Sequence, residues 1–349
     1  MTEIAILGVG ARTPLGYDRE SSAAAVRAGI SVIEEHPFMI DRFGMPMKVT
    51  RDAALPPDLF GPERLLALAE PAARAGLAPL AGLAGAGPVA VVFSTGEARP
   101  GQEAGTDAEV AGRLRDALQG AARLDRVGHS MSGHAGAILA FEAARRLLAE
   151  GRAEFVLAGG VDSYLCPDTL EWLDETEQLH SEENIYGFCP GEAAGFVLLA
   201  RAEAARRLGL APALWLVSAG TAREENLIKT DDICLGEGLA AAFAAAAAPL
   251  QEGEAVDRIL CDMNGERYRG NEYGFAALRV PGLFRDAAGF EAPADCWGDV
   301  GAASAPLHAA LVAEAGARGY APGPLSLLWA GSEAGLRGAA ILRGPGGAA

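Results

Sequence analysis

Positive charge is scarce in this sequence, and this scarcity argues against several classes of binding partner. The chain of 349 residues has 29 lysines and arginines against 46 aspartates and glutamates, so its formal net charge is −17. Contacts from lysine and arginine to phosphate supply most of the affinity for nucleic acid. A surface this acidic also repels anionic membranes and acidic protein partners. We therefore expect no nucleic-acid ligand.

Long hydrophobic runs and a recognisable leader are also missing. An alanine-rich run at residues 238–250 is too short to span a bilayer. The first ten residues lead directly into a strand-like segment, without the basic, apolar and small-residue parts of a signal peptide. We therefore expect neither membrane insertion nor secretion.

Cysteines are few, and their spacing suggests no site. The five, at positions 166, 189, 234, 261 and 296, are odd in number and form no C-x-x-C pair. This pattern predicts reduced, mostly buried thiols in a cytoplasmic protein. The histidines and cysteines show no metal-ligand spacing either. We expect no metal and no cofactor.

Short apolar runs alternate with segments whose apolar residues recur every three or four positions. Half of the residues are hydrophobic and only 21% are charged, which is typical of tightly packed helices and strands. The alternation predicts a layered α/β fold with mainly parallel strand pairing. The predicted strands are residues 3–9, 87–95, 153–161, 193–201, 213–220, 257–265 and 325–333, and the predicted helices are residues 63–77, 135–151, 238–250 and 303–319.

The chain also repeats one local pattern half a chain apart. Residues 133–137 read GHAGA and begin a helix that leads to the strand FVLAGGVDS, and residues 298–302 read GDVGA and begin a helix that leads to LSLLWAGSE. Coincidence is an open alternative in a sequence so rich in glycine and alanine. A true duplication would place His134 opposite Asp299, each at a helix N-terminus.

Several segments resemble the β-ketoacyl synthases, a family with the thiolase fold. Residues 4–31 are similar to the family's opening strand, glycine turn and helix, and residues 144–163 to the segment after its nucleophile. Residues 187–209, GFCPGEAAGFVLLARAEAARRLG, resemble its G-F-x-x-G-E-G-A-G stretch most specifically. The resemblance implies duplicated mixed-sheet halves in an α-β-α-β-α arrangement, with residues 1–209 and 210–349 as the halves.

The residues that perform the family's chemistry are changed. The resemblance places His134 where the family has its nucleophilic cysteine, and Asn264 where it has its first catalytic histidine. The second histidine's place falls on Asp299 or Gly298, because GDVGAASA is one residue shorter than the family's stretch; the internal repeat favours Asp299. A histidine cannot form a durable thioester. The resemblance therefore implies a synthase-like subunit or adaptor without condensing activity.

Two other functions stay open at this stage. His134 and Asp299 at a helix end would form an acid/base pair, with Asn264 as an oxyanion donor, in an acyltransferase with altered catalytic residues. Alternatively, Gly128-His129-Ser130 resembles the start of a hydrolase nucleophile elbow. Ser132 in place of the elbow's second glycine, and the lack of a late loop histidine, favour a structural role for Ser130.

The resemblance also implies partners. Related synthases pair the strand matched by residues 124–130 across a twofold axis, which predicts a homodimer or a heterodimer with a synthase-like protein, and an acyl ligand is in keeping with the fold. Such a contact would cover an exposed sheet edge. Residues 42–69 resemble thiolase-like proteins encoded beside type VI secretion effectors.

Overall fold

The computed structural model describes residues 2–227, 229–230 and 232–345. Its main sheet has ten strands in the order β10-β9-β11-β12-β8-β1-β7-β6-β4-β5. The strands are β1 (Ile4–Arg12), β4 (Val89–Thr95), β5 (Leu124–Met131), β6 (Phe155–Ser163), β7 (Glu192–Arg201), β8 (Leu214–Arg223), β9 (Arg258–Cys261), β10 (Phe290–Glu291), β11 (Leu325–Gly331) and β12 (Leu336–Arg343), and a separate hairpin is formed by β2 (Glu34–Ile40) and β3 (Pro46–Val49).

The sheet consists of two copies of one topology. Outward from the β1–β8 junction the order is β1-β7-β6-β4-β5 on one side and β8-β12-β11-β9-β10 on the other. Each side pairs its first three strands antiparallel and its last three parallel. The two copies follow the chain in the same sequence. The division at residues 209 and 210 itself stays a prediction.

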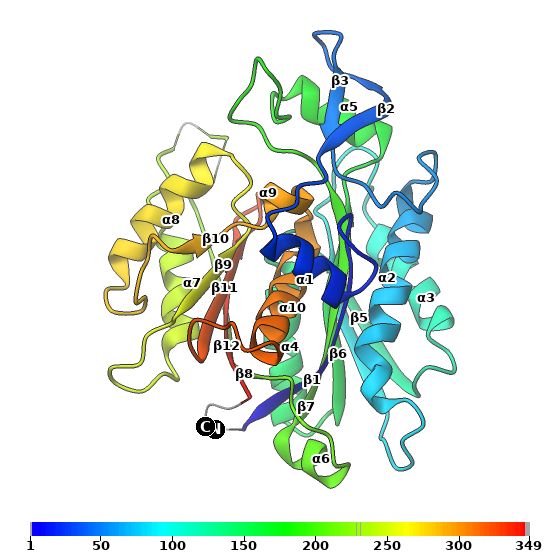
Figure 1. Ribbon diagram of the computed structural model, residues 1–349, viewed down its shortest axis with the longest axis vertical. Coiled ribbons are helices and arrows are strands. Elements are labelled where there is room, and N and C mark those ends of the chain that lie inside the picture. Colours follow the sequence, from blue (N-terminus) through cyan, green and yellow to red (C-terminus); the bar gives the residue numbers. More distant parts are fainter. Residues whose placement is uncertain (1, 228, 231, 346–349) are drawn as a thin grey trace.

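Helices cover the outside of both halves of the sheet and form a layer between the halves (Figure 1). α4 contacts β6 and β4 in the half of the sheet that begins with β1, and β8 and β12 in the half that begins with β8. α10 contacts β7 and β1 in the first half and β11 in the second, so these two helices form the layer between the halves. α2 lies outside one side and α7 outside the other. The helices are α1 (Arg19–Arg27), α2 (Gly61–Leu77), α3 (Thr106–Ala117), α4 (Gly136–Ala149), α5 (Pro167–Glu175), α6 (Ala202–Arg207), α7 (Glu237–Ala247), α8 (Arg267–Arg279), α9 (Ala294–Trp297) and α10 (Ser304–Ala317), with 3₁₀ turns η1 (Ala78–Leu80) and η2 (Gly301–Ala303).

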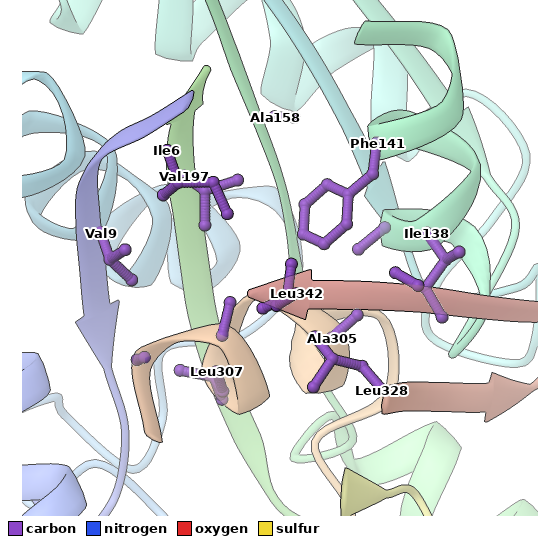
Figure 2. Packing of buried hydrophobic residues seen from close by; sticks show 14 of the residues in the cluster. Ile6, Val9, Ile138, Phe141, Ala158, Val197, Ala305, Leu307, Leu328 and Leu342 are labelled. Carbon is purple, nitrogen blue, oxygen red and sulfur yellow. The ribbon is translucent and has the colours of Figure 1, made fainter. Parts of the chain in front are cut away.

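The central core contains side chains from both copies (Figure 2). Phe141 of α4 and Leu307 of α10 are buried in one cluster with Val197 of β7 and Leu342 of β12. Burying aliphatic and aromatic surface of this kind is the main stabilising contribution to folding. The shared core fixes the N-terminal ends of α4 and α10 relative to each other.

Gly8 and Gly10 of β1 serve helix packing. A Cβ atom at Gly8 would collide with the backbone of Gly76, and one at Gly10 with the backbone of Ala72, both in α2. The glycines thus let α2 approach the strand closely.

The layered α/β fold with duplicated mixed-sheet halves, expected from the resemblance, is confirmed, but the expectation of mainly parallel pairing is wrong. β11 and β12 are joined by a short turn and must run antiparallel. β12 was not predicted as a strand, since LRGAAILR is rich in small residues. No helix in the described part of the chain is long and apolar enough to cross a membrane.

Candidate functional site

The N-terminal ends of the two central helices meet at a buried ion pair. His134 lies two residues before the first residue of α4, and Asp299 lies two residues before η2, which leads into α10. The Nε2 atom of His134 is 2.8 Å from Oδ1 and 3.0 Å from Oδ2 of Asp299. Both residues are 4% exposed. The structure therefore brings together the two positions that the internal repeat relates.

The backbone around Asp299 is held by the segment that resembles the synthases most specifically. Asp299 donates its N–H to the carbonyl oxygen of Cys189 and accepts a hydrogen bond from the N–H of Gly191, both at 2.8 Å. A Cβ atom at Gly191 would collide with the carbonyl oxygens of Trp297 and Asp299. The glycine thus allows this close approach, and residues 189–191 fix the backbone position from which the Asp299 side chain extends.

Asn264 and Arg269 complete the network around Asp299. The Nδ2 atom of Asn264 donates to Oδ2 of Asp299 at 2.6 Å, and the backbone N–H of Gly301 donates to Oδ1 at 2.8 Å. Arg269, on α8, lies with its Nη2 atom 3.4 Å from Nε2 of His134. The same guanidinium donates to Asp262 at 2.8 Å and to the carbonyl oxygen of Gly331 at 2.9 Å. Each carboxylate here thus has a cation beside it.

The electrostatics favour a charged pair of His134 and Asp299 over a neutral one. Burial is the largest single influence and disfavours the imidazolium, but the charge and hydrogen bond of Asp299, together with the charge of Asp262, raise the pKa of His134. Burial would also raise the pKa of Asp299, but His134 and then Arg269 hold it well below its ordinary range. Since Nε2 carries the proton that Asp299 accepts, the Arg269 contact is an approach of two donors, which lowers the pKa of His134.

A cavity of about 380 Å³ opens beside His134. One side of the cavity is charged, with Arg99 donating to Asp162 at 2.6 Å. The cavity is lined by Glu97, Ala98, Arg99, Met131, Gly133, His134, Asp162, Tyr164, Trp172, Leu173, Phe188, Glu333 and Ala334. Its volume lies within the range of small-molecule pockets.

The turn between β11 and β12 lines the cavity and is hydrogen-bonded to the segment just before α4. The hydroxyl of Ser332 accepts a hydrogen bond from the N–H of Ala135 at 2.9 Å and donates to the carbonyl oxygen of Ser132 at 2.6 Å. The next two backbone N–H groups, of Glu333 and Ala334, donate to the two carboxylate oxygens of Glu97 at 2.9 and 3.0 Å. We call these two N–H groups the 333–334 nest, because consecutive backbone donors form an anion-binding concavity.

Ser130 lies on β5 without the partners of a hydrolytic serine. Its hydroxyl donates to the hydroxyl of Ser94 at 3.3 Å. The neighbouring His129 points to Asp107, with Nδ1 2.8 Å from Oδ2. Across the described residues, Ser130 has no histidine or carboxylate hydrogen-bond partner. These contacts favour the structural role of Ser130.

The thiols are not activated as replacement nucleophiles. All five cysteines are free, and four are buried, as the sequence predicts. Burial raises the pKa of Cys189 to about 11, and it raises that of Cys261 further still. Because the thiolate is the reactive form, such thiols are inert near neutral pH.

One side-chain group away from the cavity has the donor set for a cation. Ligand atoms of Glu224, Cys234 and Glu272 all lie within 4.8 Å of one another. Glu272 is already paired with Arg337 at 2.5 Å, and Glu224 accepts the N–H of Gly238 at 2.8 Å. The arginine supplies the positive charge that a metal would otherwise provide. Sequence spacing did not reveal this group, because its members are far apart in the chain.

Sequence reasoning found His134, Asn264 and Asp299 but missed the residues that surround them. Arg269 and Glu97 lie in segments whose sequence carried no recognised signal. The one available signal for Arg269 was a basic residue five positions after Asn264, in a helix that follows a predicted strand. Whether the three predicted residues take part in a reaction stays a prediction.

Comparison with known proteins agrees with this architecture. Residues 129–205 match the family model described as β-ketoacyl synthase, N-terminal domain. The ishigamide ketosynthase/chain length factor is 18% identical with a TM-score of 0.79, and the match covers 98% of this chain and 99% of that one. A β-ketoacyl synthase from Burkholderia phymatum STM815 is 16% identical with a TM-score of 0.74, covering 99% of this chain and 100% of that one. No curated protein sequence matches the chain. At these identities the structural likeness shows the fold.

Proposed function

We propose that this chain is a member of the β-ketoacyl synthase/thiolase-fold superfamily and acts as a subunit or adaptor without condensing activity. The observation that carries the proposal is the His134–Asp299 ion pair at the meeting point of the two central helices. Condensation needs a thiolate to carry the acyl group and imidazoles to assist decarboxylation. At the positions that the resemblance assigns to those groups, His134 and Asn264 both bind Asp299 instead.

The overall charge supports the same proposal. Acidic acyl-carrier proteins bind basic surfaces, and a partner at −17 would repel them. One structural relative is named as a type II acyl-carrier protein in complex with its ketosynthase, at 15% identity and a TM-score of 0.77. For this chain we propose a cytoplasmic role beside another protein. An adaptor beside type VI secretion effectors is one form of it, supported by the resemblance of residues 42–69.

Intact-protein mass after incubation with a malonyl or acyl thioester tests the proposal. We expect an unchanged mass, because the position of the nucleophile holds an imidazole engaged with Asp299. A cysteine-containing synthase treated in parallel should gain the acyl mass. A stable adduct on this chain would overturn the proposal and favour the acyltransferase with altered catalytic residues.

Supplying the missing thiol is expected to leave the chain inactive. His134→Cys places a thiol beside Asp299 and Asn264, but neither residue replaces the imidazoles that assist decarboxylation. We expect no release of carbon dioxide from a malonyl thioester above the level of the unsubstituted protein. Measurable decarboxylation by His134→Cys would show that the remaining groups suffice for chemistry.

Assembly through β5 is the second prediction for this role. β5 is the last strand of the ten-stranded sheet and has β4 as its neighbour, so its outer edge carries unpaired backbone groups. Asp125 and Arg126, whose side chains form an exposed ion pair at 2.7 Å within the chain, would exchange partners across a twofold axis. We expect a homodimer, or a heterodimer with a synthase-like protein, that buries more than about 2,000 Å².

Light scattering and an edge variant measure the assembly. Val127→Pro on β5 removes a backbone donor and should reduce dimerisation without touching the His134–Asp299 pair. Asp116→Ala, at an exposed position in the last turn of α3, serves as the surface control. A protein that stays monomeric at high concentration, alone and with a synthase-like partner, would rule out the dimer.

A further inference from the structure

The cavity beside His134 contains a carboxylate that the ion-pair network does not account for. Asp162 pairs with Arg99, Asp299 with His134, and Glu333 with Lys229 at 2.6 Å. Glu97 forms no salt bridge among the residues that the structure describes, and its two oxygens accept from the 333–334 nest instead. Glu97 thus acts as an internal anion bound to backbone donors.

Two further features show what would replace Glu97. The Nε atom of Arg99 is a buried donor without a hydrogen-bond partner, on a side chain that is 6% exposed and lines the same cavity. Buried donors normally have an acceptor, so this guanidinium keeps an unused donor beside the cavity, which favours an anionic ligand there. The cavity also has an aromatic lining of Tyr164, Trp172 and Phe188, and the ring of Tyr164 lies against the guanidinium of Arg99, 4.1 Å from centroid to Cζ.

We propose that the cavity is a binding site for a monocarboxylate with an aromatic or otherwise apolar body, and that Glu97 occupies the carboxylate position until such a ligand displaces it. The nest selects a carboxylate because its two N–H groups each take one oxygen of the same planar group. The exchange keeps one negative charge at the nest, because the carboxylate of the ligand takes the place of the carboxylate of Glu97. The ligand body covers the aromatic wall. This proposal stands apart from the role as a subunit, because it needs neither a partner nor catalysis.

Glycine at position 133 is a condition of this arrangement. Gly133 has a φ of +63°, and a Cβ atom there would meet the Glu97 side chain. Residue 133 directly precedes His134, so the helix end and the internal carboxylate are packed against each other. Withdrawal of Glu97 would therefore widen the cavity next to His134.

Titration calorimetry with three matched probes tests the site. The probes are 4-phenylbutyrate, the neutral 4-phenyl-1-butanol and the cationic 4-phenylbutylamine. Glu97→Ala frees both nest donors and removes a like charge, so we expect at least a tenfold gain in affinity for 4-phenylbutyrate over the unsubstituted chain. Glu97→Gln keeps one acceptor and should give a smaller gain. The alcohol should gain less than threefold, because it lacks the second oxygen.

Glu171→Ala is the matched control, since it removes one exposed carboxylate beside the cavity residue Trp172 and leaves the nest intact. It should bind 4-phenylbutyrate as the unsubstituted chain does. Thermal unfolding of each variant checks that the fold is retained. The proposal is overturned if folded Glu97→Ala and Glu97→Gln bind the carboxylate no better, if the alcohol gains equally, or if the amine binds more tightly than the carboxylate.

Discussion

Asp299→Ala is expected to lower the free energy of unfolding by about 3–5 kcal/mol. The carboxylate accepts hydrogen bonds from His134, Asn264 and the N–H of Gly301 in a site where Asp299 is 4% exposed. Its removal leaves His134 buried beside Arg269 without the carboxylate that favours its protonation, and leaves the donors of Asn264 and Gly301 without their acceptor. Urea unfolding of both proteins at pH 6 gives the difference.

Asp125→Ala is the matched control for this loss. Its ion pair with Arg126 has a similar length, 2.7 Å, but both side chains are more than two-fifths exposed. Exposed pairs contribute about 0–1 kcal/mol, so the control should lose no more than that. Asp299→Asn keeps the shape and an acceptor and should lose less than Asp299→Ala. Equal, small losses in all three variants would show that the buried pair is dispensable.

The loss from Asp299→Ala should depend on pH in a defined direction. The pKa of His134 is raised, so its contribution is complete below about pH 6.5 and disappears as the pH rises through the raised value. The pKa of Asp299 is lowered, so its contribution is present above about pH 3.9 and disappears as the pH falls through the lowered value. The difference from the unsubstituted protein should therefore be largest between about pH 4 and 6.5 and smaller at pH 9. A difference that grows toward pH 9 would contradict the ion pair.

The fold could be read from local patterns because each half repeats them. The glycine turns before His134 and Asp299 signal two equivalent helix starts, and each following strand is buried and apolar. β12 and the hairpin of β2 and β3 carry no such pattern. β12 has three small residues in a row and an arginine near each end, and its position is set by pairing with β8 and β11. The sheet as a whole therefore determines it.

The site was less predictable than the fold, because its contacts cross the chain. His134 and Asp299 are 165 residues apart and were paired through the repeat. Glu97 and Glu333 are hydrogen-bonded although they lie 236 residues apart, and neither segment contains a sequence pattern that predicts this contact. Any residue except proline supplies a backbone N–H, so no sequence motif reveals donors such as those of the 333–334 nest. The sequence shows a histidine at the position that the resemblance gives to the nucleophile, but it does not show which residues surround that histidine.

Arg64→Leu is expected to be as damaging as Asp299→Ala, although it lies outside the cavity. Arg64, on α2, donates two hydrogen bonds to Glu192, and their side chains are 1% and 0% exposed. Glu192 also accepts from the N–H of Asp52 and the hydroxyl of Ser163, both at 2.8 Å. Glu192 is the glutamate of the segment that most resembles the synthases. Its role here is to join α2, β6 and β7.

Removing the guanidinium leaves the buried Glu192 carboxylate without a cation beside it, at a cost of about 3–5 kcal/mol in the free energy of unfolding. Arg74→Leu is the control on the same helix, because Arg74 pairs with Glu70 at 2.8 Å on an exposed face, where such pairs contribute below about 1 kcal/mol. Glu192→Leu in the Arg64→Leu background removes the unpaired charge and should recover part of the loss, which urea unfolding of the four proteins measures. If Arg64→Leu and Arg74→Leu unfold alike, the buried pair does not hold α2 to the sheet, and the apolar contacts of α2 carry that role alone.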